Sequence, residues 1–247
     1  MTRFIGIDGC KKGWFFVCLD QNRSCEWGIL ETIGALSSLS TKDDVILIDI
    51  PIGLKEIDNR ERLCDRLARK LLKKRASSIF PAPSRLAVKA PDYKTASGLN
   101  FKYTGRKLSK QSYFIMPKID QVDQFIRQTG KGFNIREYHP ELCFLALNRF
   151  APLLYSKKQK LGQKERVDIL ARYLESAQDI IAEAGKDILK KDAATDDIID
   201  ALAGAVTAEF NHRVVSLPDP PEMDNKGIPM AITYPRVQRD REPGAKK

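Results

Sequence analysis

Short apolar runs separated by turns open the chain. Residues 4–7 and 14–19 are two such runs, and a turn flanked by Gly9 and Gly13 separates them. Two apolar strands around a glycine-flanked turn predict a β-hairpin. Residues 24–32 predict a third strand, so we expect the chain to begin with an antiparallel meander.

A later apolar run, residues 45–48, is uninterrupted and rich in β-branched side chains, as expected for a central strand buried on both faces. Residues 133–137 predict a further strand. Apolar positions at helical spacing predict helices over residues 58–75, 117–128, 142–150 and 165–183, and from Thr195 onwards.

This order of elements predicts one α/β domain over residues 1–217. Residues 55–130 would form a helical and loop insertion after the central strand, and residues 218–247 a partly disordered, proline-rich and basic extension. Residues 87–113 show little periodicity, and long segments without secondary structure are usually functional or disordered.

Two of the predicted buried strands end in an aspartate. Asp8 follows the first strand, and Asp49 follows the run over residues 45–48. A buried carboxylate is costly unless a charged partner satisfies it, and a metal ion is the simplest partner. The alternative is that Asp8 only caps its turn through backbone NH groups. Because the pattern occurs twice, the metal interpretation is favoured.

Further acids follow later in the chain. Glu141 comes shortly after the strand over residues 133–137, and Asp197 and Asp200 are three positions apart, so they share a helix face. Acids in a first helical turn also stabilise the positive end of the helix. This stabilisation of the helix end explains Asp200 less well. The small residues Gly204 and Ala205 near it would let the helix approach the sheet closely and would bring Asp200 towards the strand ends.

Converging carboxylates repel one another unless cations neutralise them, and oxygen ligands suit Mg²⁺ or Mn²⁺. Two such ions can activate water and stabilise the leaving oxygen of a phosphodiester. The residues expected to be catalytic are Asp8, Asp49, Glu141, Asp197 and Asp200.

The charge of the chain favours a polyanionic partner. The formal net charge is +10, and the helix predicted over residues 58–75 carries eight bases against three acids. These bases form either a solvated face or a surface that contacts the phosphates of DNA or RNA. The expected nucleic-acid contacts are Lys11, Lys12, Arg69, Lys73, Lys74, Arg75, Ser77, Ser78, Arg85 and Lys160.

Cysteine usage and hydropathy indicate a cytoplasmic protein. The five cysteines are odd in number and include no CxxC pair, so we expect reduced, packed thiols. No signal peptide is expected at the start, and no apolar run approaches the roughly 20 residues needed to span a bilayer. His139 is interpreted as a structural residue, with a general base or a DNA contact as alternatives.

Five motifs together resemble one family of prokaryotic proteins. They are IGIDGCKKGW, IDIPIGL, RASSIFPAPSR, HPELCF and DDIIDALAGAVTA. The family is catalogued as a domain of unknown function and described as predicted ribonuclease H-like nucleases.

The resemblance implies a ribonuclease H-like mixed sheet, made of an antiparallel meander plus parallel strands and flanked by helices. It makes Asp8 the metal ligand of the first strand, Asp49 that of the central strand, and Asp197 and Asp200 those of the last helix. Resolvases of this fold act as dimers, so a homodimer is a further expectation.

Three functions remain open at this point. The leading hypothesis is a metal-dependent nuclease that hydrolyses DNA or RNA. The second is an ATP-dependent phosphotransferase of the actin-like and sugar-kinase superfamily, whose phosphate-binding hairpin resembles the opening hairpin here. The third is a non-catalytic nucleic-acid-binding protein in which the acids serve only as caps and salt-bridge partners.

Overall fold

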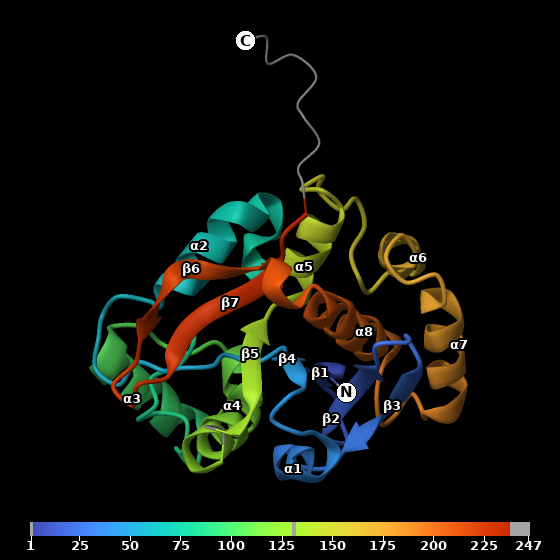
Figure 1. The fold of residues 1–247 in the computed structure, drawn as a ribbon. Coiled ribbons are helices and arrows are strands. Elements are labelled where there is room, and N and C mark those ends of the chain that lie inside the picture. Colours follow the sequence, from blue (N-terminus) through green and yellow to red (C-terminus); the bar gives the residue numbers. More distant parts are fainter. Residues whose placement is uncertain (1, 130–131, 238–247) are drawn as a thin grey trace.

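One seven-stranded mixed sheet forms the centre of the molecule. The structure, a computed structural model, describes residues 2–129 and 132–237 (Figure 1). The strand order is β3-β2-β1-β4-β5-β7-β6. The strands are β1 (Phe4–Gly9), β2 (Trp14–Leu19), β3 (Cys25–Leu30), β4 (Val45–Ile48), β5 (Asn134–Tyr138), β6 (Val214–Met223) and β7 (Pro229–Pro235).

The first three strands form an antiparallel meander, β4 runs parallel to β1, and β5 and β7 continue the parallel part. The edge strand β6 is antiparallel to β7. This arrangement confirms the ribonuclease H-like topology expected from the sequence.

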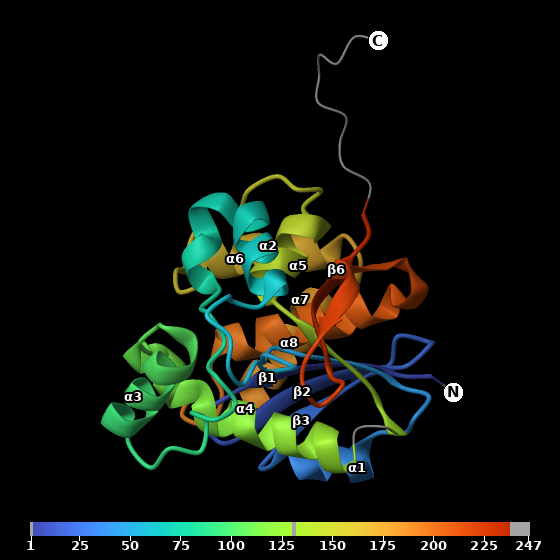
Figure 2. The ribbon, with the colours of Figure 1, turned by 90° about the vertical axis from the view of Figure 1, so that its left-hand side faces the viewer.

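Helices cover both faces of the sheet. The longer helices are α2 (Leu63–Leu72), α3 (Tyr93–Thr104), α4 (Lys110–Gln128), α5 (Pro140–Leu147), α6 (Lys160–Ala171), α7 (Ala177–Asp187) and α8 (Thr195–Glu209). The short ones are η1 (Ile33–Ala35), α1 (Leu36–Leu39), η2 (Lys73–Ser78) and η4 (Asn211–Arg213). Figure 2 shows α2, α5, α6, α7 and α8 on one side of the sheet, and α1 and α4 on the other, with α3 beside α4.

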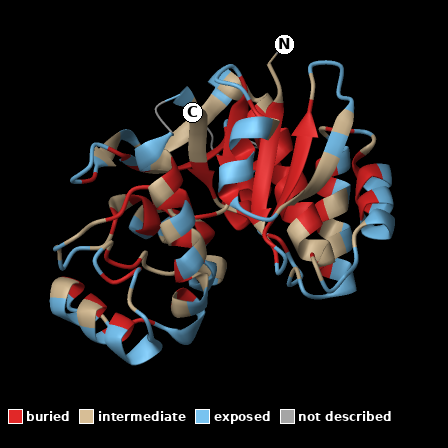
Figure 3. Ribbon diagram, turned by 90° about the horizontal axis from the view of Figure 1, so that it is seen from below, coloured by how far each residue is buried: buried red, intermediate tan, exposed pale blue. Residues whose placement is uncertain are grey.

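Side chains alternate between two cores along the central strands. Phe4, Val45 and Leu47 pack on the α8 side, whereas Ile5 and Ile46 pack on the α4 side. The central strands are therefore buried on both faces, as Figure 3 shows. The same alternation assigns positions 8 and 49 to the α8 side of the sheet.

The segment expected to lack periodicity contains the whole of α3 and the start of α4. Asp92 caps α3 by accepting a hydrogen bond from the Thr95 NH, and Gly105 ends it with a φ of 70°. Helix α4 begins at Lys110, and Pro117 lies inside it instead of starting it. The expected start at Pro117 was wrong because the cap at Ser109 precedes it by two helical turns.

Three other helix predictions also change. The helix expected over residues 142–150 is α5, which spans Pro140–Leu147. The helix expected over residues 165–183 is two helices, α6 and α7, and α6 begins at Lys160, ahead of the expected start. The helix expected over residues 58–75 begins only at Leu63 and becomes the 3₁₀ segment η2 at Lys73. Its buried face includes Asp65, since Arg62 turns inward to meet this carboxylate.

The expected C-terminal extension contributes to the sheet. Strand β6 runs through three prolines, Pro218, Pro220 and Pro221, and its pairing with β7 is interrupted between Leu217 and Glu222. An edge strand tolerates proline because one side of its backbone needs no partner. The basic tail expected after residue 235 lies, beyond Val237, outside the described residues.

Within the described ranges, no helix is both long enough and apolar enough to cross a membrane. The five cysteines are free, as expected from their number and spacing.

A candidate carboxylate site at the strand ends

Helix α8 lies directly on β1, and a glycine makes this possible. A Cβ atom at Gly6 would lie 2.0 Å from the Ala201 carbonyl oxygen and 2.2 Å from the Ala205 nitrogen. A Cβ atom at Gly204 would lie 2.9 Å from the Gly6 Cα. Backbone therefore packs against backbone, and the N-terminal turns of α8 are held beside the carboxyl ends of β1 and β4.

Three carboxylates from three elements meet there. Asp8 lies near the end of β1, Asp49 directly after β4, and Asp200 in the second turn of α8. Asp8 and Asp200 are buried, and Asp49 is partly buried. The Oδ1 of Asp8 accepts a hydrogen bond from the Gly9 NH at 2.7 Å. This contact agrees with the turn-capping alternative but leaves the neighbouring acids unexplained.

The pKa values of these acids are raised. Burial and then the charges of Asp49 and Asp200 raise the pKa of Asp8 well above its ordinary value. Burial raises the pKa of Asp49 to about 8 and that of Asp200 to about 6, although Lys157 opposes both shifts. The three carboxyl groups thus favour protonation or the approach of a cation.

A lysine that the sequence reasoning did not single out lies among these acids. The Lys157 Nζ donates to Asp200 Oδ2 at 2.6 Å. Burial alone would lower the pKa of Lys157, but Asp200 and Asp8 outweigh it and raise that pKa. The other oxygen of Asp200, Oδ1, is buried without a hydrogen-bond partner.

The loop that carries Lys157 is fixed by two arginines. The Arg75 Nη2 donates to the Tyr155 carbonyl at 2.6 Å and to the Leu153 carbonyl at 3.2 Å. The Arg166 Nη1 donates to the Tyr155 carbonyl at 3.3 Å. The carboxylate of Glu165 accepts from the NH groups of residues 154 and 155. Arg75 thus has an identifiable role within the motif RASSIFPAPSR.

Glu141 lies in the first turn of α5 and not at a strand end. Its Oε1 accepts from Arg166 Nη2 at 2.5 Å, and its Oε2 lies 3.6 Å from Arg75 Nη1. Its charge nevertheless contributes to the raised pKa values of Asp49 and Asp200. Glu141 therefore belongs to the surroundings of the cluster, where two arginines already neutralise it.

Asp197 lies at the edge of the cluster. Its Oδ2 accepts from the Ala194 NH at 2.8 Å, so it also caps α8. Burial raises its pKa, and it interacts electrostatically with Asp8. Asp197 therefore both caps the N-terminus of α8 and lies near the other acids.

A second lysine, Lys118, contacts the turn that follows Asp8. The Lys118 Nζ, from α4, donates to the Gly13 carbonyl at 2.5 Å and lies 4.4 Å from the centre of the Trp14 ring. Burial lowers the pKa of Lys118, while Cys10, Asp8 and Asp197 raise it. The carboxylates therefore have one lysine from α4 and one from the loop before α6 as cationic neighbours.

The residues expected to contact nucleic acid separate into three groups. Lys11 and Lys12 are exposed in the turn that follows Asp8. A second group lies on η2 and at the start of α6, and it consists of Lys73, Lys74, Arg75, Ser77, Ser78 and Lys160. The last two, Arg69 and Arg85, are held by internal carboxylates. Arg69 pairs with Glu61, and Arg85 binds Asp123 Oδ1 at 2.9 Å and also Asp224.

A buried ion network lies near the cluster, since Glu137, close to the end of β5, contributes to the raised pKa of Asp49. Arg62, only 3% exposed in its side chain, binds Asp65 Oδ1 at 2.5 Å and Glu137 Oε2 at 2.8 Å. The sequence reasoning placed Arg62 on a solvated or phosphate-facing surface, and this was wrong because two buried acids require its charge. Burial raises the pKa of Glu137 to about 7, and Arg62 opposes that shift.

His139 precedes α5 as its N-cap residue. Its Nε2 lies 3.3 Å from the Ser78 carbonyl, and burial lowers its pKa to about 4. The imidazole is therefore neutral at physiological pH. Its contact with η2 is consistent with the structural interpretation.

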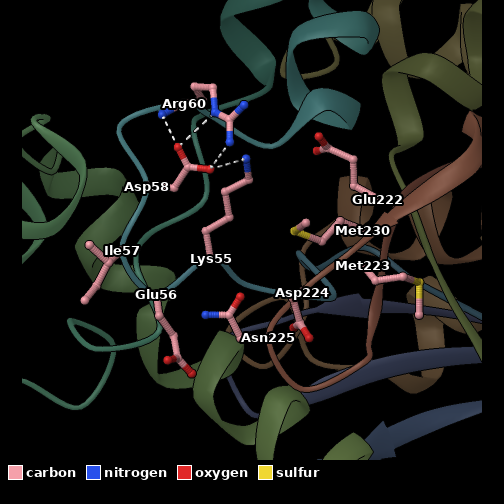
Figure 4. A pocket seen from close by; sticks show the side chains of 10 residues that line it. All are labelled: Lys55, Glu56, Ile57, Asp58, Arg60, Glu222, Met223, Asp224, Asn225 and Met230. Atoms are coloured by element: carbon pink, nitrogen blue, oxygen red, sulfur yellow. Dashed lines mark hydrogen bonds and ion pairs between the residues drawn. The ribbon is translucent and has the colours of Figure 1, made fainter.

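A pocket opens on another part of the surface, between residues 55–60 and the β6–β7 turn (Figure 4). Its lining includes Lys55 and Arg60, but both side chains bind Asp58. None of the acids expected to be catalytic lines this pocket. The carboxylate cluster, with its unbalanced charges, is the stronger candidate site.

The donor chemistry of the cluster fits a hard divalent cation, because its ligating atoms are carboxylate oxygens. The unpartnered Asp200 Oδ1 is an orphaned acceptor of the kind that a cation satisfies. In the described part of the chain, however, no three or more acidic, histidine or cysteine side chains are arranged to hold a metal ion. The acids are brought together without forming a closed ligand set, and Lys157 lies between them.

The fold and the cluster define an α/β protein of ribonuclease H-like topology with acids at the ends of β1 and β4 and on α8. The chain belongs to the DUF429 family, described as a protein of unknown function, whose model matches residues 6–223. No curated protein and no solved structure matches the chain.

Proposed function

We propose that this protein is a metal-dependent nuclease that hydrolyses phosphodiester bonds of DNA or RNA at the carboxylate cluster. The observation that carries the proposal is the meeting of Asp8, Asp49 and Asp200 from β1, β4 and α8, each with a raised pKa. Such repulsion destabilises the folded protein and persists where the site needs it for function.

The cluster would bind Mg²⁺ or Mn²⁺ through Asp8, Asp49 and Asp200, with Asp197 at its edge. A bound ion of this kind supplies Lewis-acid polarisation of a phosphate and a more acidic water. The protein's own groups position the substrate. Lys157 presents a positive charge inside the site, and the exposed Lys11 and Lys12 adjoin it in the turn after Asp8. These lysines attract the phosphates on either side of the scissile bond.

Lys157 and a bound cation would compete for the same carboxylates. Its ammonium already binds Asp200 Oδ2, so an entering cation would share or displace that contact. We expect Lys157 to release Asp200 when a metal binds and to become available to a phosphate oxygen. The arginine-fixed loop would keep the lysine close to the site during this exchange.

One observation favours the non-catalytic alternative. The Lys157–Asp200 pair neutralises part of the cluster without any metal, as a purely structural salt bridge would. In that case the acids would stabilise the fold around Lys157, and nucleic acid would bind through the surface lysines alone.

Calorimetric titration with Mn²⁺ and with Mg²⁺ tests the proposal. The wild type should bind with low-micromolar to millimolar affinity, and Asp8→Asn and Asp49→Asn should both lose this binding. The same three proteins are then incubated with labelled single-stranded DNA, duplex DNA and RNA, and only the wild type should cleave. Metal binding that is unchanged in both variants would contradict the proposed site. Nucleic-acid binding without metal binding or cleavage would favour the non-catalytic alternative.

A further inference from the structure

An aromatic ring on α4 is exposed close to the carboxylate cluster. Phe114 is 75% exposed, so most of its apolar surface faces solvent. Lys118 follows it by four positions, so the two residues share a helix face and lie about 6 Å apart along the axis. Lys118 in turn contacts Gly13, in the turn that follows Asp8.

The ring is supported from behind. Tyr113 lies 5.8 Å from Phe114 between ring centres, and Tyr93 meets Tyr113 edge-on at 5.5 Å. The Tyr93 hydroxyl donates to the Leu108 carbonyl at 2.8 Å. The three rings thus form a row that extends from α3 to α4, with the Phe114 ring at its solvent end.

Positive charge surrounds this row. Residues 92–118 contain six lysines or arginines and a single acid, Asp92. Lys110 precedes Phe114 by four positions on the same helix face, and both Lys107 and Lys110 are exposed. This combination of an exposed ring and unbalanced cations complements an anionic, ring-bearing polymer more closely than an apolar or acidic protein surface.

We propose that the α4 face formed by Lys110, Phe114 and Lys118 is a binding subsite for single-stranded nucleic acid. One base stacks on the Phe114 ring, and Lys107 and Lys110 contact the phosphates beside it. The inference rests on the proposed function, since the strand that occupies this subsite is the one that leaves the carboxylate cluster. The short distance along α4 puts the stacked base within a few nucleotides of the scissile bond.

The occupant is a single strand for a geometric reason. A base inside a duplex already stacks on both faces and cannot offer one to a ring on a helix surface. An unpaired base can do so, and stacking on an aromatic side chain tolerates any base because each has a π-face. The subsite therefore selects strand state and not sequence.

Fluorescence anisotropy with a labelled oligothymidylate strand tests this, with EDTA present to prevent metal-dependent cleavage. Phe114→Ala should weaken binding at least about fivefold. Phe114→Trp should bind as tightly as the wild type or more tightly, and Phe114→Leu should resemble Phe114→Ala. Ile57→Ala is the matched control, since Ile57 is 71% exposed and lines the separate pocket in Figure 4.

The outcomes separate this subsite from the proposed function. If Phe114→Ala or Phe114→Leu binds the strand like the wild type, the stacking subsite is wrong. The metal titrations of Asp8→Asn and Asp49→Asn would still test the proposed function independently. An equal loss for the matched duplex would also overturn the subsite, because duplex bases cannot use the ring. If the wild type binds metal but no nucleic acid, both the subsite and the nuclease proposal fail.

Discussion

The Lys157 ammonium lies 2.6 Å from Asp200 Oδ2, although the two residues are 43 positions apart in the chain. Asp200 reaches this point because α8 packs on Gly6, and Lys157 because arginines fix its loop. The contact thus depends on two independent features of the fold. The contact brings one positive charge into the group of carboxylates and offsets part of their mutual repulsion.

Lys157→Gln should destabilise the metal-free protein by about 1–2 kcal/mol. Removing one partner of a buried pair costs about 3–5 kcal/mol, but about a third of the Lys157 side chain is exposed, so solvent screens part of the effect. Thermal unfolding in EDTA measures the loss. Saturating Mn²⁺ should restore most of it, because the cation replaces the missing charge.

Lys158→Gln is the matched control for this prediction. Lys158 is the next residue and is exposed, so its replacement should change neither the unfolding temperature nor the response to Mn²⁺ beyond a few tenths of a kcal/mol. Equal behaviour of the two variants would show that Lys157 does not neutralise the acids in solution.

The raised pKa of Asp49 makes the stability of the metal-free protein depend on pH. A carboxyl group whose folded pKa exceeds its unfolded value binds more protons in the folded state, so its contribution to stability falls as pH rises. For Asp49 this loss extends from about pH 4, the unfolded value, to about pH 8. Asp49→Asn should therefore stabilise the metal-free protein at pH 8, by an amount on the order of 1 kcal/mol, and much less at pH 5.

Urea unfolding of wild type and Asp49→Asn in EDTA, at pH 5 and at pH 8, measures this difference. Asp44→Asn is the control, and its effect on stability should have the opposite sign. Hydrogen bonds from Arg3 and Thr41 hold the pKa of the Asp44 carboxyl low despite its burial. Asp44→Asn should destabilise the protein at pH 8. An Asp49 variant that is less stable than the wild type at pH 8 would mean that its charge is satisfied without metal.

The positions of the acids at the strand ends could be predicted from the sequence, because the pattern of the neighbouring residues determines them. An apolar, β-branched run ending in Asp49 predicts a buried strand with its acid at the carboxyl end, and alternation then fixes the face. The small residues near Asp200 predicted close packing on the sheet, and the contact between Gly204 and Gly6 confirms it. No such local pattern marks Lys157, whose place depends on loop contacts with Arg75.

The C-terminal strands and α3 were missed for different reasons. The prolines of β6 are incompatible with a central strand, and only its position at the sheet edge, next to β7, makes them tolerable. For α3 the signals were present in the sequence, since Asp92 and Gly105 are a typical N-cap and C-terminal glycine. The helix was missed because its apolar periodicity is weak. The periodicity is weak because α3 packs beside α4 and not on the sheet.

Gly6→Ala should be severely destabilising, by about 3 kcal/mol or more. The new methyl group would overlap the backbone of Ala201 and Ala205, which cannot move without lifting α8 from β1. Gly98→Ala is the control. Nothing lies within 4 Å of a Cβ atom at Gly98, which is inside α3, so this change should stabilise the protein by about 0.5–1 kcal/mol. Urea unfolding distinguishes the two, and equal effects would contradict the close packing.

The buried network of Arg62 gives the last prediction. Arg62→Gln should cost about 3–5 kcal/mol, because it leaves Asp65 and Glu137 buried without their partner. Arg62→Lys should rescue little, since one ammonium cannot replace a planar guanidinium that binds both acids. Arg60→Gln is the control, because its side chain is 79% exposed and solvent screens its pair with Asp58, so this change should leave the stability almost unchanged. Adding Glu137→Gln to Arg62→Gln should recover part of the loss by removing one uncompensated charge. If the double variant is no more stable than Arg62→Gln, the packing of the Arg62 side chain, and not its charge, holds this part of the fold.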